Sequence, residues 1–558
     1  FAARVRRCAR GLLSLGLEPG AAVCVLGTSE WPVALFGVMA AGGAPALLDE
    51  RWPDAVLLPA IRRTGARLLL VERDFHARAQ RLEKAAAGLR AWVVGDGSTE
   101  APSLEAVLAR PDSASEAAVG ERMAALAPGA RAAVLFTSGA TAEPKAIAVS
   151  HQNLLWTTER LTRVLAFGDA ETVLSLVPPA LAAAQTLGLH LALRHGAQIY
   201  LPRPGARPID LLREVRPTVV LAPPRAWERF ARTIEDRLSA EPPKRQKVEQ
   251  WARRLALERV RRQAEQQSVA PSLAARCRLA ASLVHDPLKL SLGLNRTRVL
   301  ACVGGPVGEG VGELLASLAA PLHEVYGQAE TCGVSSVLVP DAAAPGTQGR
   351  PLPGLEVRLS DEGVFSVRGG NVCLGALEAG ELQPLADADG WLRTGDSGRL
   401  GTQGLLEVDG RVADLLARRG GATVAPRRLE ERLRRIRLVR DAMIVGEARG
   451  GFAALLTLEP DAAARFAVEK ALPSEPSRFI EHSVVRGWIA RQVDQVNQEL
   501  GEDERVVSFA VLPEPFTIAC GELSSSGELR REAIRERHAQ RIAELGAAAG
   551  ARPRPLTA

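Results

Sequence analysis

The chain has 558 residues, of which 47% are hydrophobic and 24% charged, with a formal net charge of +6. A single hydrophobic core stops growing at roughly 250–300 residues, so this length predicts more than one domain. The small net charge gives no reason to expect a nucleic-acid partner. No run approaches the ~18 apolar residues of a membrane span, so we expect no transmembrane segment.

The cysteines are scattered along the chain and no pair has metal-ligand spacing, which favours reduced thiols in a cytoplasmic protein. There are seven of them: Cys8, Cys24, Cys277, Cys302, Cys332, Cys373 and Cys520. The chain opens with Phe1 directly in a helical pattern. We therefore expect the natural N-terminus, with any targeting segment, to be missing.

In chain order, the N-terminal part alternates helical patterns with short apolar runs. Helices are predicted at 4–16 and 31–41. Such alternation indicates βαβ units, hence an α/β fold with mostly parallel sheets covered on both faces. The predicted strands of a first series are 22–26, 46–48, 68–71 and 91–94, and those of a second series are 173–177, 198–201, 219–222, 299–303 and 324–326.

A helical insertion is predicted at 223–293. Its centre, 244–262, is strongly basic and carries Val248, Trp251 and Leu255 on one face. The favoured interpretation is a solvated basic helix packed by that stripe. The alternative is contact with an anionic membrane surface.

From 340 to 407 short strands alternate with Gly and Pro turns, which predicts an all-β subdomain. The remainder predicts a small α+β unit, with a helix at 427–436, strands at 442–445 and 453–458, and helices through 500 and over 529–545. We therefore expect domains at 1–409 and 410–558.

One polar turn, between an apolar run at 132–136 and a β-type run at 146–149, carries several hydroxyls, a glycine and Lys145. A strand–turn–strand of this kind can wrap a polyphosphate, because hydroxyls and backbone N–H groups donate and the ammonium supplies charge. The spacing is not that of a Walker loop. An ordinary hairpin with a polar tip remains the alternative. Ser150 then predicts a helix N-cap.

This stretch resembles the phosphate-binding signature of AMP-forming acyl-CoA synthetases, TSGTTGxPKG followed by SHxN. Ala140, Ala142 and Ala146 depart from it. The resemblance implies that Lys145 is catalytic and that Thr141 also helps to hold Mg²⁺. The nucleotide-binding positions it implies here are Thr137, Ser138, Gly139 and Thr141.

Three further stretches resemble nucleotide-binding motifs of the same family. The segment 323–331 resembles YGxTE, which implies that Tyr326 and Gly327 border the purine and that Glu330 is catalytic and binds Mg²⁺; Ala329 replaces the threonine. The segment 301–306 resembles SGAAP, with Gly304 and Gly305 beside adenine. The segment 390–398 resembles GWxxTGD, which implies that Asp396 anchors the ribose. The pair Gly410-Arg411 then adds the guanidinium of Arg411.

The segment 225–229 and the insertion resemble long-chain acyl-CoA synthetases. A loop containing Gly420 and Gly421 resembles the one that lines the pantetheine tunnel, and it is most similar to that of the bubblegum-like long-chain branch. The resemblance implies a large N-terminal domain with a mobile C-terminal lid. It also implies two steps, in which a fatty acid reacts with ATP to give acyl-AMP and coenzyme A then displaces AMP.

The C-terminal segment 517–531 departs from the family motif, because Glu528 stands where a catalytic lysine is expected. Leu181 replaces an aromatic or His gate and Ala413 a charged hinge residue. An anion facing two anionic groups should slow adenylation by at least ~10²-fold. The alternatives to a fatty acid–CoA ligase are therefore transfer to a carrier protein and a nucleotide- or acyl-binding pseudoenzyme.

Overall fold

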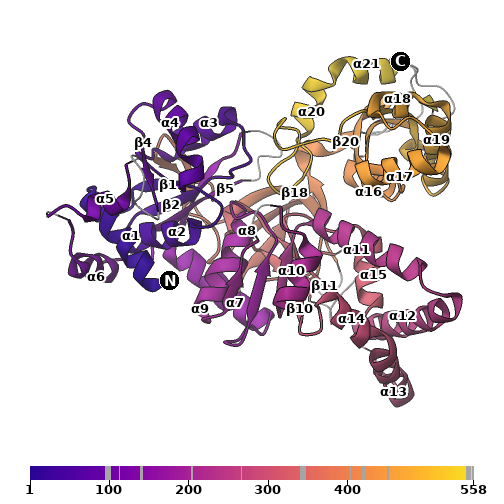
Figure 1. The fold of residues 1–558 in the computed structure, drawn as a ribbon, viewed down its shortest axis with the longest axis horizontal. Coiled ribbons are helices and arrows are strands. Elements are labelled where there is room, and N and C mark those ends of the chain that lie inside the picture. Colours follow the sequence, from indigo (N-terminus) through magenta and orange to yellow (C-terminus); the bar gives the residue numbers. More distant parts are fainter. Residues whose placement is uncertain are drawn as a thin grey trace.

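The computed structural model describes residues 1–94, 102–111, 113–137, 143–202, 205–265, 267–339, 347–401, 404–417, 423–448, 451–547 and 554–555. Within these ranges, two large sheets form the N-terminal part, a four-stranded antiparallel sheet joins them, and a separate sheet forms the C-terminal part (Figure 1). The predicted α/β class is confirmed.

The first sheet has the order β17-β16-β6-β5-β2-β1-β3-β4. Its β1 (Ala22–Leu26) is buried at all five positions, because helices cover both faces of its parallel part. One face packs under α3 and α4, and the other under α1 and α2. The elements are α1 (Ala2–Ser14), α2 (Trp31–Ala40), β2 (Ala44–Leu47), α3 (Asp54–Thr64), β3 (Leu68–Val71), α4 (His76–Ala85), β4 (Arg90–Val93), α5 (Leu104–Leu108), α6 (Glu116–Ala124), β5 (Arg131–Phe136), β6 (Ala146–Ser150), β16 (Gly375–Glu378) and β17 (Glu381–Gln383).

The second sheet has the order β13-β12-β11-β10-β9-β7-β8. Its parallel strands run from β8 to β11, and β12 and β13 are antiparallel. The elements are α7 (His151–Val164), β7 (Thr172–Ser175), α8 (Ala182–Gln185), a π-type turn Thr186–His190, α9 (Leu191–Arg194), β8 (Gln198–Tyr200), α10 (Pro208–Val215), β9 (Val219–Ala222), β10 (Val299–Val303), α15 (Glu309–Ser317), β11 (Leu322–Tyr326), a 3₁₀ turn Ala329–Thr331, β12 (Ser336–Val337) and β13 (Arg350–Pro351).

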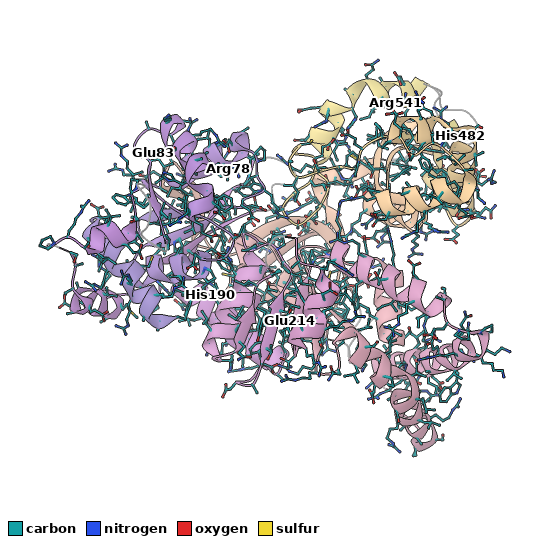
Figure 2. All side chains as sticks on the ribbon, in the orientation of Figure 1. Arg78, Glu83, His190, Glu214, His482 and Arg541 are labelled. Carbon is teal, nitrogen blue, oxygen red and sulfur yellow. The ribbon has the colours of Figure 1, made fainter. Side chains whose placement is uncertain are left out.

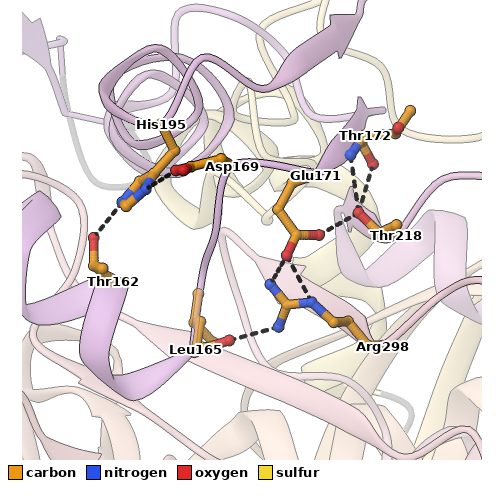
Figure 3. Close-up of polar contacts among 8 residues, drawn as sticks. All are labelled: Thr162, Leu165, Asp169, Glu171, Thr172, His195, Thr218 and Arg298. Atoms are coloured by element: carbon orange, nitrogen blue, oxygen red, sulfur yellow. Dashed lines mark hydrogen bonds and ion pairs between the residues drawn. The ribbon is translucent and has the colours of Figure 1, made fainter.

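A polar network ties the starts of three strands of this sheet together (Figure 3). Arg298, just before β10, donates to Glu171 and to the Leu165 carbonyl, with Nε 2.8 Å from Glu171 Oε1. Thr218, before β9, also donates to Glu171. The arginine and the hydroxyl together hold the pKa of Glu171 below its ordinary value, although burial acts in the opposite direction.

The helical insertion projects from the second sheet at a corner of the molecule (Figure 1). It consists of α11 (Pro224–Ser239), α12 (Pro243–Ala264), α13 (Pro271–Ala280), a π-type turn Ala281–His285 and α14 (Asp286–Leu292). Trp227 of α11 is buried and donates to the Ala301 carbonyl of β10, which fastens the insertion to the sheet. On α12, Leu255 is buried as expected, whereas Val248 is 45% exposed.

The segment 340–407 is rich in strands, as expected, but its strands belong to three different sheets. β14 (Glu356–Leu359), β15 (Val364–Arg368), β18 (Leu392–Leu400) and β19 (Leu406–Arg411) form the joining sheet. β16 and β17 extend the first sheet and β13 the second. The strands of this predicted all-β subdomain are thus divided among sheets. β16 pairs with β6, which lies far earlier in the chain, and β13 pairs with the nearby β12.

The C-terminal part has the sheet order β22-β23-β24-β25 and a two-stranded ribbon β20-β21. Its elements are β20 (Leu416–Ala417), β21 (Thr423–Val424), α16 (Pro426–Arg434), β22 (Val439–Ala448), β23 (Gly451–Leu458), α17 (Pro460–Lys470), α18 (Pro476–Glu481), α19 (Ser483–Gln498), β24 (Val506–Leu512), α20 (Arg531–Arg537), α21 (Ala539–Ala547) and β25 (Arg554–Pro555). The predicted helix over 529–545 is wrong in one respect, since it breaks at His538 into α20 and α21. The His538 ring is held there by Glu522, at 3.0 Å.

Labelled side chains locate the parts of the molecule in Figure 2. Arg78 and Glu83 mark the helices outside the first sheet, Glu214 those over the second, and His482 and Arg541 the C-terminal part. His190 lies between the two large sheets, where its ring packs edge-on against Phe36 at 5.4 Å. Burial lowers the pKa of His190 to about 4, so it stays neutral in the core. No helix in the described ranges is both long and apolar enough to cross a membrane.

Candidate functional site

The predicted nucleotide residues come together where β10 and β11 end beside the β18–β19 hairpin. β10 and β11 are parallel neighbours, so their carboxyl ends meet at one edge of the sheet. Gly304 directly follows β10, and Tyr326 is the last residue of β11. Asp396 of β18 pairs directly with Arg411, the last residue of β19. Four of the predicted residues, far apart in sequence, therefore share one edge of two sheets.

Asp396 is the centre of a hydrogen-bond cluster and is 5% exposed. Its Oδ2 accepts from the Tyr326 hydroxyl at 2.7 Å and from Gln328 Nε2 at 2.5 Å. Its Oδ1 lies 3.2 Å from Arg411 Nε. Thr394 supports the cluster, because its carbonyl accepts from Gln328 and Arg411 at 3.0 and 2.8 Å. A carboxylate held in this way is fixed in position before any ligand binds.

The surrounding charges affect both the phenol and the guanidinium. Burial, and next the adjacent Asp396 carboxylate, raise the pKa of Tyr326 well above its ordinary value, so the phenol stays a donor. Burial opposes the charge on Arg411, but Asp396, Glu330 and Glu528 together outweigh it and raise its pKa. The edge therefore combines a neutral phenol, a carboxylate and a permanent cation.

The polar turn lies between two antiparallel strands, β5 and β6, as expected. Thr137 and Lys145 close it, since the Thr137 hydroxyl accepts from the Lys145 N–H at 3.0 Å and the Thr137 N–H donates to the Lys145 carbonyl at 3.1 Å. The Lys145 side chain is exposed. Ser138, Gly139, Ala140, Thr141 and Ala142 lie outside the described residues.

The helix that follows the turn begins as the sequence predicts. Ser150 and Asn153 form a reciprocal capping box, with the Ser150 hydroxyl accepting from the Asn153 N–H at 3.1 Å. The Asn153 amide also donates to the carbonyls of Gly370 and Val372. Ala146, by contrast, is fully buried in β6 opposite Phe136.

Glu330 lies on the short 3₁₀ turn after Tyr326 and is half-buried. Gly327, before that turn, approaches Gly333 so closely that a Cβ would lie 2.5 Å from the Gly333 carbonyl oxygen. Ala329, at the position where the family has a threonine, is buried and packs in a cluster with Ala182 and Cys332. The turn therefore presents Glu330 but no hydroxyl at 329.

The hairpin tip Ser524–Gly527 of the C-terminal part docks against the N-terminal part beside this edge. Trp52 Nε1 donates to Ser525 Oγ at 2.8 Å, and Arg51 donates to the Ser525 carbonyl at 3.0 Å. Gly304 has φ +91, and a Cβ there would lie 3.1 Å from Ser526 Cβ. Glycine at 304 thus permits both this backbone conformation and the close approach of the tip.

Glu528 follows the tip and is directed towards Gly305, where a Cβ would lie 3.5 Å from its Oε1. Although its side chain is exposed in part, desolvation in the interface between the two parts raises its pKa, and Arg427 and Arg411 only partly offset this. Arg427 reaches the same place and donates to the Pro306 carbonyl at 3.3 Å. The position of the expected lysine is therefore held by a carboxylate near two arginines.

Arg531 does not replace the missing lysine. It forms a bidentate pair with Glu430, at 2.8 and 2.6 Å, and lies 3.6 Å from Asp414. It is 8% exposed, and its guanidinium is buried inside the C-terminal part.

Two substituted positions also have clear surroundings. Leu181 forms a parallel bridge with Phe136 and is buried. Ala413 lies on the exposed 3₁₀ turn after β19. Gly420 and Gly421, the predicted pantetheine loop, lie outside the described residues.

Several residues at this edge were not predicted from the sequence. Gln328 and Thr394 lie inside the motifs around Tyr326 and Asp396, and their polar side chains could have indicated a role there. Trp52, Ser525 and Arg427 carried no signal, because only the docking of the C-terminal part brings them here.

Comparisons with known proteins agree with this arrangement. The AMP-binding enzyme family matches residues 1–377, and the C-terminal domain of AMP-binding enzymes matches residues 413–549. A long-chain-fatty-acid–CoA ligase, ACSBG2 of Gallus gallus, is 28% identical over 97% of this chain and 76% of its own length. The long-chain-fatty-acid–CoA ligase FadD15 of Mycobacterium bovis is 27% identical over 97% of this chain and 90% of its own.

Solved structures share the fold. The anthranilate CoA ligase AuaEII in complex with anthranoyl-AMP superposes with a TM-score of 0.69 at 17% identity, over 97% of this chain and 92% of that one. A benzoate CoA ligase of Burkholderia xenovorans gives a TM-score of 0.67 at 19% identity, over 95% and 93%. The resemblance to AMP-forming acyl-CoA synthetases is confirmed, and the chain belongs to the AMP-binding enzyme family.

Proposed function

We propose that the protein activates a long-chain fatty acid with ATP, through acyl-AMP, to a coenzyme A thioester. Family membership and relatives named as long-chain-fatty-acid–CoA ligases support this activity. The observation that carries it is the buried Asp396, held by Tyr326, Gln328 and Arg411. A carboxylate accepts hydrogen bonds from both hydroxyls of a ribose, which suits the nucleoside part of ATP.

In this proposal the edge of the two sheets binds the nucleoside. Asp396 and Arg411 hold the ribose, and Tyr326 lies against the purine, bordered by Gly304, Gly305 and Gly327. Lys145 and the turn residues Thr137, Ser138, Gly139 and Thr141 hold the phosphates. Gly420 and Gly421 line the path of the pantetheine arm.

Magnesium fits the proposed site through Glu330. Mg²⁺ is usually bound by one or two carboxylates together with substrate phosphates and water. The observation that fits is the half-buried Glu330, on the turn directly after Tyr326. Glu330, with Thr141, would hold the ion, which neutralises phosphate charge when bound.

The chemistry is two displacements in sequence. A carboxylate oxygen bonds to the α-phosphorus while the bond to pyrophosphate breaks, which gives acyl-AMP. The thiolate of coenzyme A then bonds to the acyl carbon and AMP leaves. The protein contributes orientation and charge neutralisation. We propose 1–409 and 410–558 as the two domains, the second acting as a lid that rotates between the steps.

Pyrophosphate exchange into ATP, measured with carboxylic acids from acetate to palmitate, tests this function. We expect exchange that increases with chain length up to long-chain acids. Exchange confined to short or aromatic acids would contradict the substrate class. If the second step required a carrier protein and not coenzyme A, the carrier protein would be the acyl acceptor.

A second candidate is a nucleotide- or acyl-binding pseudoenzyme, and Glu528 specifically favours it. Glu528 stands where the family motif has a lysine and its carboxylate is directed towards Gly305, while Arg531 pairs with Glu430. Under this alternative AMP or ATP still binds, because Asp396 and its partners are intact. Nucleotide binding without detectable exchange for any acid would decide for it.

Two statements about cellular setting belong to the proposal. Free cysteines throughout, six of the seven buried, support a reducing, cytoplasmic environment. The exposed lysines and arginines of 244–262 support peripheral contact with an anionic membrane.

A further inference from the structure

Nearly all the excess positive charge of the chain lies in one projecting part. Residues 243–292 contain eleven Lys and Arg against four Asp and Glu, a net charge of +7, whereas the whole chain has +6. The rest of the molecule is therefore close to neutral. This concentrated charge belongs to α12, α13 and α14. Of these, α12 and α13 form an outlying corner of the molecule, and α14 leads back to the second sheet (Figure 1).

Most of these cations are exposed and not neutralised by the protein. The pairs formed here are Arg245 with Glu241 and Glu249, and Arg262 with Glu258. Seven further basic side chains are exposed and form no ion pair with the described residues: Lys244, Lys247, Arg254, Arg259, Arg261, Arg276 and Arg278.

The same corner carries exposed leucines on one continuous helical stretch. Leu279, Leu283 and Leu290 are 53%, 59% and 53% exposed. Their spacings of four and seven residues place them along one side of the helix formed by α13, the π-type turn and α14. The opposite side is already filled, since Leu273, Cys277, Ala280 and Val284 pack against Ala252 and Leu255 of α12.

We propose that Leu279, Leu283 and Leu290, surrounded by these cations, form a docking surface for an anionic lipid bilayer. Leucines that enter the acyl boundary gain hydrophobic free energy, while Lys and Arg gain from anionic headgroups. An isolated exposed leucine needs no explanation, but three along one side of a basic helix match a membrane-surface helix. Charge complementarity selects lipid over a second copy, because two copies would bring two net charges of +7 together.

This surface deepens the proposed function, since a long-chain acid partitions into lipid and would reach the enzyme there. The leucines lie on the stretch from α13 to α14, which packs against the basic helix at 244–262. The first stretch would contact the acyl chains and the second the anionic headgroups. The leucines lie outside the nucleotide site, so their replacement leaves adenylation of a water-soluble acid unchanged.

Co-sedimentation of the full chain with vesicles tests the proposal. We expect binding to phosphatidylcholine vesicles that contain phosphatidylglycerol, little binding to phosphatidylcholine alone, and loss of binding at high salt. Leu279→Ser with Leu283→Ser should weaken binding by about tenfold for each leucine. Lys244→Gln with Lys247→Gln should weaken it by about tenfold in total.

Matched controls separate the surface from a general effect. Leu155→Ser removes a leucine that is 56% exposed on α7, and Lys84→Gln removes an exposed lysine of α4. Both controls should bind like the unchanged chain. Equal binding to neutral vesicles, no binding at all, or equal loss in the controls would overturn the proposal. So would a concentration-dependent dimer that the leucine variants abolish.

The two proposals fail in distinguishable ways. Pyrophosphate exchange with octanoate in the absence of vesicles depends on the nucleotide site and not on the leucines. Vesicle binding without exchange would reject the proposed activity and support the docking surface. Exchange without vesicle binding would support the activity and reject the docking surface.

Discussion

Asp396 is well suited to bind a nucleoside, because it is buried and already held by Tyr326, Gln328 and Arg411. Because Tyr326, Gln328 and Arg411 already hold the carboxylate, a ribose that binds there does not have to order it first.

Asp396→Ala should reduce AMP and ATP affinity by about 10- to 100-fold, because it removes charge-assisted hydrogen bonds worth roughly 1.5–3 kcal/mol. Isothermal titration with AMP measures this. Asp361→Ala, an exposed acid in the turn between β14 and β15, is the control. Unchanged affinity in Asp396→Ala would place the nucleotide elsewhere.

Glu528→Lys should raise pyrophosphate exchange by about 10²-fold, since it restores a cation beside the expected α-phosphate. Glu528→Gln, which removes the charge without adding one, should give a smaller gain. Arg427 and Arg411 approach the same position and would repel the new lysine, so the gain should increase further in the Glu528→Lys, Arg427→Gln double variant. No gain in any of the three would locate the defect in the alanine-substituted turn.

Glu324, on the same strand as Tyr326, should make the stability of the protein pH-dependent. Burial raises its pKa to about 7, although Arg427 acts in the opposite direction. The folded state therefore binds a proton that the unfolded chain, with an ordinary pKa near 4.5, has lost. Stability falls as pH rises from 4.5 to 7, and the penalty is complete above pH 7.

Glu324→Gln should consequently be more stable than the unchanged chain by about 1–3 kcal/mol above neutral pH, and not below pH ~4.5. Urea unfolding at several pH values provides the measurement. Glu313→Gln, an exposed position on α15, is the control. A constant difference at all pH values would show that packing and not titration is responsible.

At the scale of elements, α11 connects the second sheet with the C-terminal part. Arg225 lies 2.7 Å from Asp441, Glu228 2.9 Å from Arg434, and Arg232 3.7 Å from Glu459. Three ion pairs from successive turns of one helix therefore hold α16 and β22 in the position in which Ser525 contacts Trp52.

Glu228→Gln should loosen this contact by about 1 kcal/mol, because the pair with Arg434 is partly buried. We expect faster amide hydrogen exchange in α16 and in the hairpin 523–529, with the first sheet unchanged. Glu235→Gln, an exposed position on the same helix without an ion pair among the described residues, is the control. Equal exchange in both variants would show that the pair does not restrain the lid.

The sequence predicted the bounds of some strands and missed other strands entirely. The buried parallel strands β9 and β10 have the predicted bounds, because continuous apolar runs between turns admit few other structures. Strand β24 (Val506–Leu512) was missed although all seven residues are buried. The local signal was present, because Val506–Leu512 is an apolar run interrupted only by Ser508, and the parallel pairing with β23 confirms it as a strand.

At the scale of the whole molecule, stability at low pH should depend on the Glu171–Arg298 network. The pKa of Glu171 is lowered in the fold, so its contribution is present above the unfolded pKa near 4.5 and is lost as pH falls through the folded value. Glu171→Gln should therefore be less stable at neutral pH by about 1–2 kcal/mol, and the difference should diminish as pH falls below the ordinary pKa near 4.5. Thermal unfolding from pH 3 to 7 measures this, with Asp169→Asn as the exposed neighbour. A pH-independent difference would contradict the titration argument.

The sequence by itself determined the α/β class, the order of the elements and the identity of the nucleotide motifs. These features depend on local patterns, such as apolar runs, the Ser150 cap and short spacings around Tyr326 and Asp396. Tertiary structure alone decided which strands of 340–407 join which sheet and that Arg531 pairs with Glu430. It also decided that Arg427 reaches the Pro306 carbonyl and that Trp52 contacts the hairpin tip. Each of these is a contact over a hundred or more residues, or a choice among several apolar partners. The free energy of packing the whole chain, and not local preference, makes that choice.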